Sequence, residues 1–289
     1  MLCERGGLTY GEQFSGYFVP ENARLRRIVY LLCSLAVELG SGRSKKELGL
    51  ESLVGVQFGL IFIAVIYAVQ LKTGFARSLF NGYFLTNGVV VSLKLLTLLA
   101  GLFILNRSNL YLRESELDLL EYAIVRTLSL LFRVLLVISG NLRAAFLCVV
   151  GFSLNLYVLI LFEAAKFIAR EAGAKYYFLS TFSSGRRIYG IFLLFVAIQT
   201  ATFYDMAQIL GTCFEIVASH KSRLQIGTTL LLTGVFFKLS AFPGHLWAAE
   251  VYEGSSDPVM GFFRLPVKIS ALAFLSSFLR IAIEPVAGL

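Results

Sequence analysis

Two lysines, Lys238 and Lys268, lie deep inside long apolar stretches of the sequence. A charged side chain at the centre of a bilayer costs roughly 2.5–3.5 kcal/mol on insertion scales, so such residues normally face a protein interior or a hydrated cavity. Lys268 follows Pro258 by ten residues, which is about 15 Å along a helix and close to the middle of a roughly 30 Å hydrocarbon core. Because a buried lysine readily changes its protonation state, both residues are candidates for proton carriers in a hydrated pathway.

A predicted helix break lies next to the first of these lysines. The pair Pro243-Gly244 follows Lys238 closely, and a proline removes a backbone donor and ends or kinks a helix. Broken helices within a membrane are tolerated only beside protein or a water-filled cavity, and in transporters they mark ion sites. We expect the segment Gly244–Pro258 to be a connecting loop with one interfacial aromatic residue, Trp247. His245, taken alone, fits a structural histidine better than a proton relay.

Four further basic residues lie in or beside apolar stretches. A long basic side chain near a helix end usually bends toward the lipid headgroups, so we expect Arg126, Arg133 and Arg143 to do so. For Lys94, a side chain that bends toward the headgroups and a side chain that faces the interior of a helix bundle are equally compatible with the sequence.

The elements that would hold these residues are membrane-spanning helices. Of the 289 residues, 57% are apolar and 15% are charged, with a mean hydropathy of +0.76, against about 45–50% apolar and roughly 25% charged in soluble domains. A helix needs about 20 mostly apolar residues to cross a bilayer. Seven stretches qualify and an eighth is short: Ser52–Leu71, Gly88–Leu105, Leu119–Ser139, Ala144–Phe162, Ala174–Tyr204, Leu224–Phe242, Pro258–Ile281 and the short Ile28–Leu39.

The sequence therefore predicts an all-α polytopic membrane protein with about seven or eight spans and a broken helix near Pro243. No stretch alternates apolar and polar residues with period two, which argues against a membrane β-barrel. We expect residues 1–51 to form an N-terminal polar segment with a short first helix, and residues 52–285 to form the helix bundle.

Charge and cysteine content argue against several other classes. The formal net charge of +8 is typical of Lys and Arg at membrane interfaces, and no zinc spacing or aromatic-basic groove points to nucleic acid. The four cysteines are scattered without a Cys-x-x-Cys pair, which argues against an Fe–S cluster, a zinc site or a disulfide framework.

The run FKLSAFPGHLWAAEVYEGSSDPVMGFFRLPVK (Phe237–Lys268) closely resembles NADH dehydrogenase subunit 2, an antiporter-like membrane subunit of respiratory complex I. The family pattern is a lysine on a broken helix, Pro-x-His-x-Trp, a Val-Tyr-Glu-Gly turn, a Pro-Val helix entry and a second lysine. The matching residues are Lys238, Pro243, His245, Trp247, Val251 to Gly254, Pro258, Val259 and Lys268. Further blocks at Glu171–Gly185 and Leu93–Leu105 look like the family's sixth and third helices, and the resemblance covers roughly residues 50–285 and is strongest after residue 171.

The resemblance implies an antiporter-like bundle without a redox cofactor in this chain, since flavin, Fe–S clusters and quinone would belong to other subunits of the complex. It implies a contribution to proton translocation coupled to electron transfer from NADH to ubiquinone. Lys238 would be the central switch lysine and Lys268 the relay toward the second half-channel. Further candidates for the pathway are His245, Arg186, Arg187 and Glu163. The implied partners are the other complex I membrane subunits and membrane lipids, but no nucleic acid.

The chain departs from the family pattern in three places. Val150 stands where the family has a glutamate on its fifth helix, Arg186 and Arg187 replace an apolar pair, and the long form of the family continues beyond Leu289. We therefore expect a separate chain to supply the further C-terminal helices. The expected docking face consists of small and polar residues: Ser270, Ala271, Ala273, Ser276 and Ser277. By association alone, the divergence favours the mitochondrial inner membrane over a bacterial plasma membrane.

Glu163 is the only carboxylate on the span that carries Val150. It lies about 20 Å along the helix and about 220° around it from Val150, so we expect an interfacial salt bridge at Glu163 and no pairing with Lys238. Two other functions remain open: a subunit of an Mrp-type cation/proton antiporter, and a non-pumping structural subunit of complex I whose lysines persist although the pathway is broken.

Overall fold

The computed structural model describes residues 77–79, 82–114, 119–163, 166–212, 220–242 and 244–280. The expected N-terminal polar segment, the expected helices Ile28–Leu39 and Ser52–Leu71, and Pro243 lie outside the described residues. The statements that follow concern the described part of the chain.

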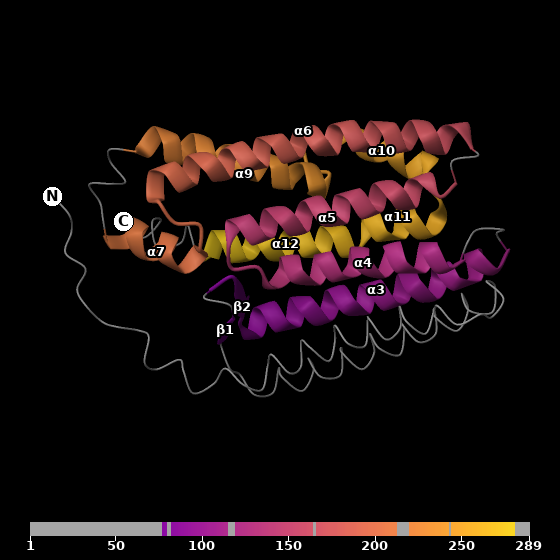
Figure 1. Cartoon of the computed structure of the whole chain (residues 1–289), viewed down its shortest axis with the longest axis horizontal. Helices are drawn as coiled ribbons and strands as arrows, with labels where there is room; N and C mark the ends of the chain where they lie inside the picture. Colours follow the sequence, from indigo (N-terminus) through magenta and orange to yellow (C-terminus); the bar gives the residue numbers. More distant parts are fainter. Residues whose placement is uncertain are drawn as a thin grey trace.

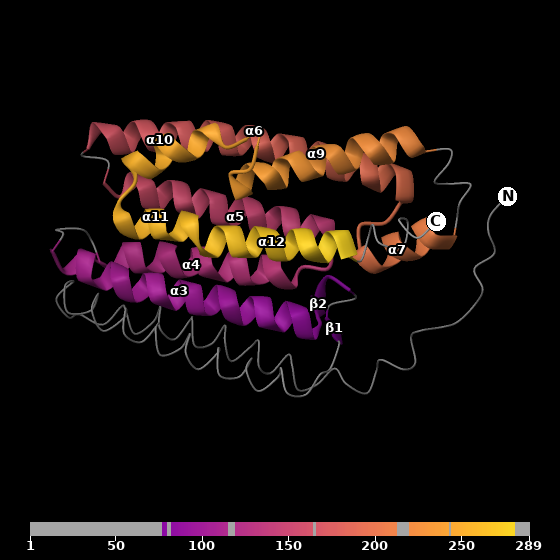
Figure 2. The ribbon, with the colours of Figure 1, turned by 180° about the vertical axis from the view of Figure 1, so that it is seen from behind.

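Long helices run side by side along the length of the molecule (Figures 1 and 2). The helices are α3 (Gly88–Glu114), α4 (Leu119–Ile138), α5 (Leu142–Leu161), α6 (Phe167–Ile198), α7 (Phe203–Thr212), α9 (Lys221–Leu239), α10 (Leu246–Gly254), α11 (Asp257–Arg264) and α12 (Pro266–Phe278). A short antiparallel hairpin, β1 (Arg77–Leu79) and β2 (Phe84–Thr86), precedes α3 and was not expected from the sequence.

Four helical segments are long and apolar enough to cross a membrane within the described residues: Gly88–Ser108, Leu142–Leu161, Phe167–Ile198 and Asp257–Phe278. The predicted all-α membrane bundle is thereby confirmed, whereas the predicted number of spans is not. In both views α4 and α9 lie alongside these segments. The charges that lower the hydropathy of α4 include Arg126 and Arg133, and both are buried within the bundle.

The layer formed by α6 and α9 depends on a close backbone approach. A Cβ atom placed on Gly190 of α6 would lie 2.8 Å from the carbonyl oxygen of Gly227 on α9 and 2.9 Å from the backbone nitrogen of Leu231. Only glycine fits such a contact, as at other membrane helix interfaces. The pair Gly190 and Gly227 therefore fixes the separation of the two helices.

The predicted helix break is present, because α9 ends at Leu239 and the chain resumes as α10. Ser240 adopts a left-handed conformation with φ of 56°, and the N–H of Ala241 bonds the carbonyl of Phe236 at 3.0 Å, a pattern that closes helix C-termini. The expectation of a connecting loop with an interfacial tryptophan was wrong. Residues Leu246–Gly254 form α10, and Trp247 is buried and donates from Nε1 to the Phe237 carbonyl at 3.0 Å.

A second break, which was not expected, divides the last span. The sequence predicted one helix over Pro258–Ile281, but α11 ends at Arg264 and α12 begins at Pro266. Pro266 lacks a backbone N–H and disfavours helical geometry at the preceding residue, and that residue, Leu265, belongs to neither helix. Lys268 is consequently the third residue of α12 and lies next to a discontinuity, as Lys238 does.

Candidate functional site: a buried lysine among hydroxyl groups

Lys238 is the penultimate residue of α9, and its side chain is buried between α5 and α6. Its ammonium nitrogen lies 2.7 Å from Ser153 Oγ, 2.9 Å from Ser180 Oγ and 3.2 Å from the Tyr176 hydroxyl. An ammonium group has three donors and no acceptor. The three neutral oxygens therefore satisfy all of its hydrogen-bonding capacity.

Two features of the surroundings favour the cationic form of Lys238 in the absence of a carboxylate, whereas burial and the nearby positive charges of Arg133 and Arg187 oppose it. Its nitrogen lies 5.0 Å from the ring centre of Tyr176 and 5.5 Å from that of Phe152, distances at which aromatic faces attract cations. The negative end of the α9 dipole is adjacent, which adds a favourable contribution of about 0.3–1 kcal/mol in typical exposed sites. Lys238 makes no salt bridge with any residue that the structure describes.

The hydroxyl groups allow Lys238 to exist in two protonation states. A hydroxyl both donates and accepts, whereas a carboxylate only accepts. When the ammonium loses a proton, a hydroxyl such as that of Ser180 can rotate and donate to the neutral amine. The site is therefore chemically suited to a group that gains and loses a proton without leaving a buried polar atom unpaired, which would cost about 1–3 kcal/mol.

A pocket of about 220 Å³ adjoins this cluster between α5 and α6. Its lining includes the three hydroxyl residues that bind Lys238, together with Ser184, and also Val150. Val150 precedes Ser153 by less than one turn of α5 and lines the same pocket as the three hydroxyl ligands of Lys238. Here it contributes an apolar side chain.

Positive charge dominates the interior of the described bundle. Lys94, Arg126, Arg133, Arg187 and Lys238 are all buried, whereas every described Asp and Glu whose exposure is known is half-buried or exposed. The expectation that Arg126 and Arg133 reach the headgroups was wrong, because their side chains point into the bundle. Arg143 is exposed at the start of α5, in agreement with that expectation.

Neutral groups hold the buried arginines. The Arg126 guanidinium donates to the Ser108 hydroxyl. The Arg133 guanidinium lies 5.0 Å from the ring centre of Phe262 and 5.8 Å from that of Phe152, and its nitrogens have no hydrogen-bond partner among the described residues. The Phe152 ring is thus close to both Arg133 and Lys238.

Arg187 and Arg186 differ although they are adjacent. Arg187 is buried on α6, where it bonds the Ser183 carbonyl at 3.3 Å and the Ser184 hydroxyl at 2.8 Å. Ser184 also lines the pocket beside Lys238. Arg186 is half-buried, and its guanidinium lies 5.1 Å from the ring centre of Phe182. Only Arg187 is therefore connected to the lysine cluster.

The other proposed pathway residues lie apart from the Lys238 cluster. Lys268 is half-buried and forms no hydrogen bond or salt bridge with the described residues. His245 is exposed, and its ring lies 6.1 Å from that of Phe242. Neither side chain contacts Lys238 in the described structure.

Glu163 follows the C-terminal end of α5 and forms the predicted salt bridge, at 2.6 Å to Lys166. It also accepts a hydrogen bond from Tyr111. Partial burial raises the pKa of Glu163, but the bonds from Lys166 and Tyr111 outweigh this effect and bring the pKa below its ordinary value. Burial and the neighbouring carboxylate raise the pKa of Tyr111 to about 12. Glu163 is therefore an anion engaged at the helix end and does not bind Lys238.

Sequence reasoning missed the three hydroxyl ligands of Lys238. Tyr176, Ser180, Ser183 and Arg187 recur at helical spacing within an otherwise apolar helix, and such a polar stripe indicates a face turned toward protein. That periodicity was the available signal for α6. Ser153 carries no comparable signal, because its role depends on α9 packing beside α5. In the described residues, no group of three or more His, Cys, Asp or Glu side chains could hold a metal ion.

Comparisons with known proteins agree with this architecture. A family model described as "NADH:quinone oxidoreductase/Mrp antiporter, TM" matches residues 139–287. NADH-quinone oxidoreductase subunit N of Pelagibacter ubique is 34% identical over 204 residues, which are 71% of this chain and 42% of that protein. The chain spans about half the length of the relatives it matches.

Two solved structures share the fold at low sequence identity. A chain of respiratory complex I from Thermus thermophilus superposes with a TM-score of 0.68 at 24% identity, covering 90% of this chain and 54% of that one. A chain of the Mrp complex from Dietzia sp. gives a TM-score of 0.70 at 19% identity, covering 90% and 48%. Together with the family match, which extends over more than half of the sequence, these findings place the chain in the NADH:quinone oxidoreductase/Mrp antiporter family of multi-pass membrane subunits.

Proposed function

We propose that this chain is a membrane-arm subunit of NADH:quinone oxidoreductase that contributes to proton translocation coupled to electron transfer from NADH to ubiquinone. The observation that carries the proposal is Lys238 of α9, which is buried beside the middle of α5 and bound by Ser153, Tyr176 and Ser180. This arrangement accepts both protonation states of the lysine. Curated relatives that match the chain include NADH-quinone oxidoreductase subunits.

In this proposal Lys238 is the proton-carrying group. Arg187 donates a hydrogen bond to Ser184, which lines the pocket, and so places a positive charge on the pocket side of Lys238. Lys268 is assigned the role of relay, because it lies beside the second helix break and remains partly accessible. His245, Arg186 and Glu163 are secondary candidates. The flavin, Fe–S clusters and quinone site belong to other subunits in this proposal.

Two alternatives have specific support. An Mrp-type cation/proton antiporter subunit is favoured by the shared fold. A non-pumping structural subunit of complex I is favoured by Val150, which leaves the Lys238 pocket without a carboxylate in the described residues.

Affinity purification of the full chain from detergent-solubilised native membranes separates the first two functions. Co-purification with flavin- and Fe–S-containing subunits and with NADH oxidation supports the complex I assignment. Recovery in a complex that lacks those subunits and exchanges cations for protons supports the antiporter assignment.

A separate chain that supplies the helices beyond the matched half remains part of the proposal. Most of the face that the sequence suggested is already covered, because Ser270, Ala271 and Ala273 are buried within the bundle, whereas Ser276 and Ser277 are half-buried. The exposed residues of α12 include Leu272. The named relatives are bacterial. We therefore propose that the protein is located in a bacterial plasma membrane and not in the mitochondrial inner membrane.

A further inference from the structure

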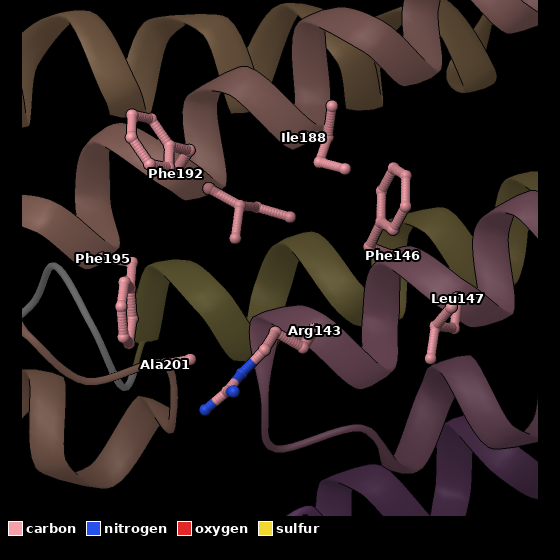
Figure 3. Close-up of a pocket in the computed structure, with 8 residues that line it drawn as sticks. Arg143, Phe146, Leu147, Ile188, Phe192, Phe195 and Ala201 are labelled. Carbon is pink, nitrogen blue, oxygen red and sulfur yellow. The ribbon is translucent and has the colours of Figure 1, made fainter.

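A second pocket lies between the beginning of α5 and the end of α6, away from Lys238. It has a volume of about 380 Å³, and almost all of its lining is apolar. In Figure 3, Ile188 and Phe192 extend from α6 and Phe146 from α5 toward the space between the two helices. The pocket is therefore a groove that follows the two helices.

One charged side chain, Arg143, lies at the end of this groove (Figure 3). It is exposed, its guanidinium carbon lies 5.6 Å from the ring centre of Phe195, and it makes no salt bridge with a described residue. The ring of Phe195 holds the guanidinium beside the groove, while its N–H groups remain available to a ligand. Guanidinium groups bind phosphate with charge-assisted and often bidentate hydrogen bonds.

The groove has the orientation of a lipid molecule in a bilayer. Arg143 is the second residue of the span Leu142–Leu161, so it lies within about 3 Å of the helix end. The span is about 30 Å long, which matches the hydrocarbon thickness, and this places Arg143 at headgroup level. From there, the apolar walls formed by Leu147, Phe192 and Ile188 lead toward the middle of the membrane.

We propose that this groove binds one anionic phospholipid, with its phosphate on Arg143 and an acyl chain between α5 and α6. Apolar walls alone would select no headgroup, since bulk lipid covers any exposed apolar helix face. The single cation at the surface end of the groove supplies the selectivity for a negatively charged headgroup. The inference concerns binding alone and does not require that Lys238 carries protons.

The test measures lipids retained by the full chain, purified in detergent and titrated with dioleoyl phosphatidylglycerol, using native mass spectrometry. The substitution Arg143→Gln is expected to weaken the tightest-bound phosphatidylglycerol about tenfold, because it removes a charge-assisted hydrogen bond. Arg170→Gln is the matched control. Arg170 is also exposed and lies 5.8 Å from the ring centre of Phe167, but it does not line this groove, so no change is expected.

Further arms identify the part of the lipid that is recognised. Dioleoyl phosphatidylcholine has the same chains without the net negative charge and is expected to bind about tenfold more weakly. Glycerol phosphate lacks the chains and is expected not to compete. Leu147→Trp narrows the groove while leaving Arg143 in place, and it is expected to weaken phosphatidylglycerol binding in a chain whose circular dichroism spectrum is unchanged.

Four outcomes would overturn the proposal. These are equal retention of both phospholipids, an Arg143→Gln variant that binds as the wild type does, equal losses in the Arg143 and Arg170 variants, and full competition by glycerol phosphate. If Arg143→Gln does not fold, retention of phosphatidylglycerol at wild-type affinity by Leu147→Trp would contradict the proposed position of the acyl chain.

Discussion

Lys238 on α9 and Ser153 on α5 are joined by a 2.7 Å hydrogen bond in the interior of the bundle. They are 85 residues apart in the sequence, and Ser153 lies near the middle of its 20-residue helix. The bond places a titratable amine at mid-depth and links the broken helix to the span that carries Val150. The chemistry proposed for this chain depends on that contact.

Removing the Ser153 hydroxyl is expected to destabilise the protein. Ser153→Ala leaves a buried ammonium donor without its closest acceptor, and the expected loss in the free energy of unfolding is about 1–3 kcal/mol. Chemical denaturation in detergent measures it. Ser92→Ala is the control, because Ser92 is exposed and bonds only the carbonyl of Val89. A Ser153→Ala variant as stable as the control would contradict the contact.

A carboxylate at position 150 is expected to couple to Lys238. A double-mutant cycle with Val150→Glu and Lys238→Met isolates this interaction, and we expect a favourable coupling of at least about 1 kcal/mol, within the range measured for contacting residues. In the Lys238→Met background the new carboxylate would be half-buried without a partner, which is unfavourable. Val150→Gln introduces a side chain of nearly the same shape as glutamate but without the charge, and it therefore controls for the added volume. Equal coupling for Gln and Glu would show that the ammonium is out of reach.

The glycine contact between α6 and α9 predicts different effects at two glycines of one helix. Gly190→Ala forces a Cβ atom against the backbone of Gly227 and Leu231, and overpacking of this kind costs about 1–3 kcal/mol. At Gly185 an added Cβ meets nothing within 4 Å, so Gly185→Ala is expected to be neutral or to stabilise the helix by up to about 1 kcal/mol. Thermal unfolding of both variants tests the contact, and equal effects would argue against it.

Stability at low pH is expected to depend on Glu163. Because the pKa of Glu163 is lower in the folded protein than its ordinary value of 4.5, its contribution is complete above that ordinary value. It is lost as the pH falls through the lower folded value. Glu163→Gln removes this part of the acid sensitivity. Unfolding midpoints between pH 3 and pH 7 measure it, and parallel curves for wild type and variant would contradict the assigned interaction.

The sequence was sufficient for the membrane class, the helical bundle and the break after Lys238, because hydropathy and proline act locally. The burial of Arg126 and Arg133 was not predictable in this way. It depends on the rotation of α4 about its axis and on aromatic rings from α5 and α11, namely Phe152 and Phe262. Hydropathy alone carries no information on that rotation.

Small residues on α12 led to a different error. Ser270, Ala271 and Ala273 indicated close helix packing correctly, but the packing partners are helices of this same chain, since α12 lies against α3, α4 and α9. A stripe of small residues predicts that a helix approaches and does not identify which helix. The ligands of Lys238 were missed for the same reason, since Ser153 and Ser180 meet Lys238 only in the folded bundle.

Proton translocation by the assembled complex tests the central claim, that Lys238 carries protons, most directly. The measurement is the number of protons translocated per NADH oxidised in sealed vesicles, for Lys238→Met and for Lys175→Met. Lys175 is half-buried at the surface, with 41% of its side chain exposed, and pairs with Glu171 and Glu250. We expect both complexes to assemble and oxidise NADH, with a reduced proton-to-NADH ratio for Lys238→Met alone. An unchanged ratio in a fully assembled Lys238→Met complex would contradict the account and favour a structural role for this subunit.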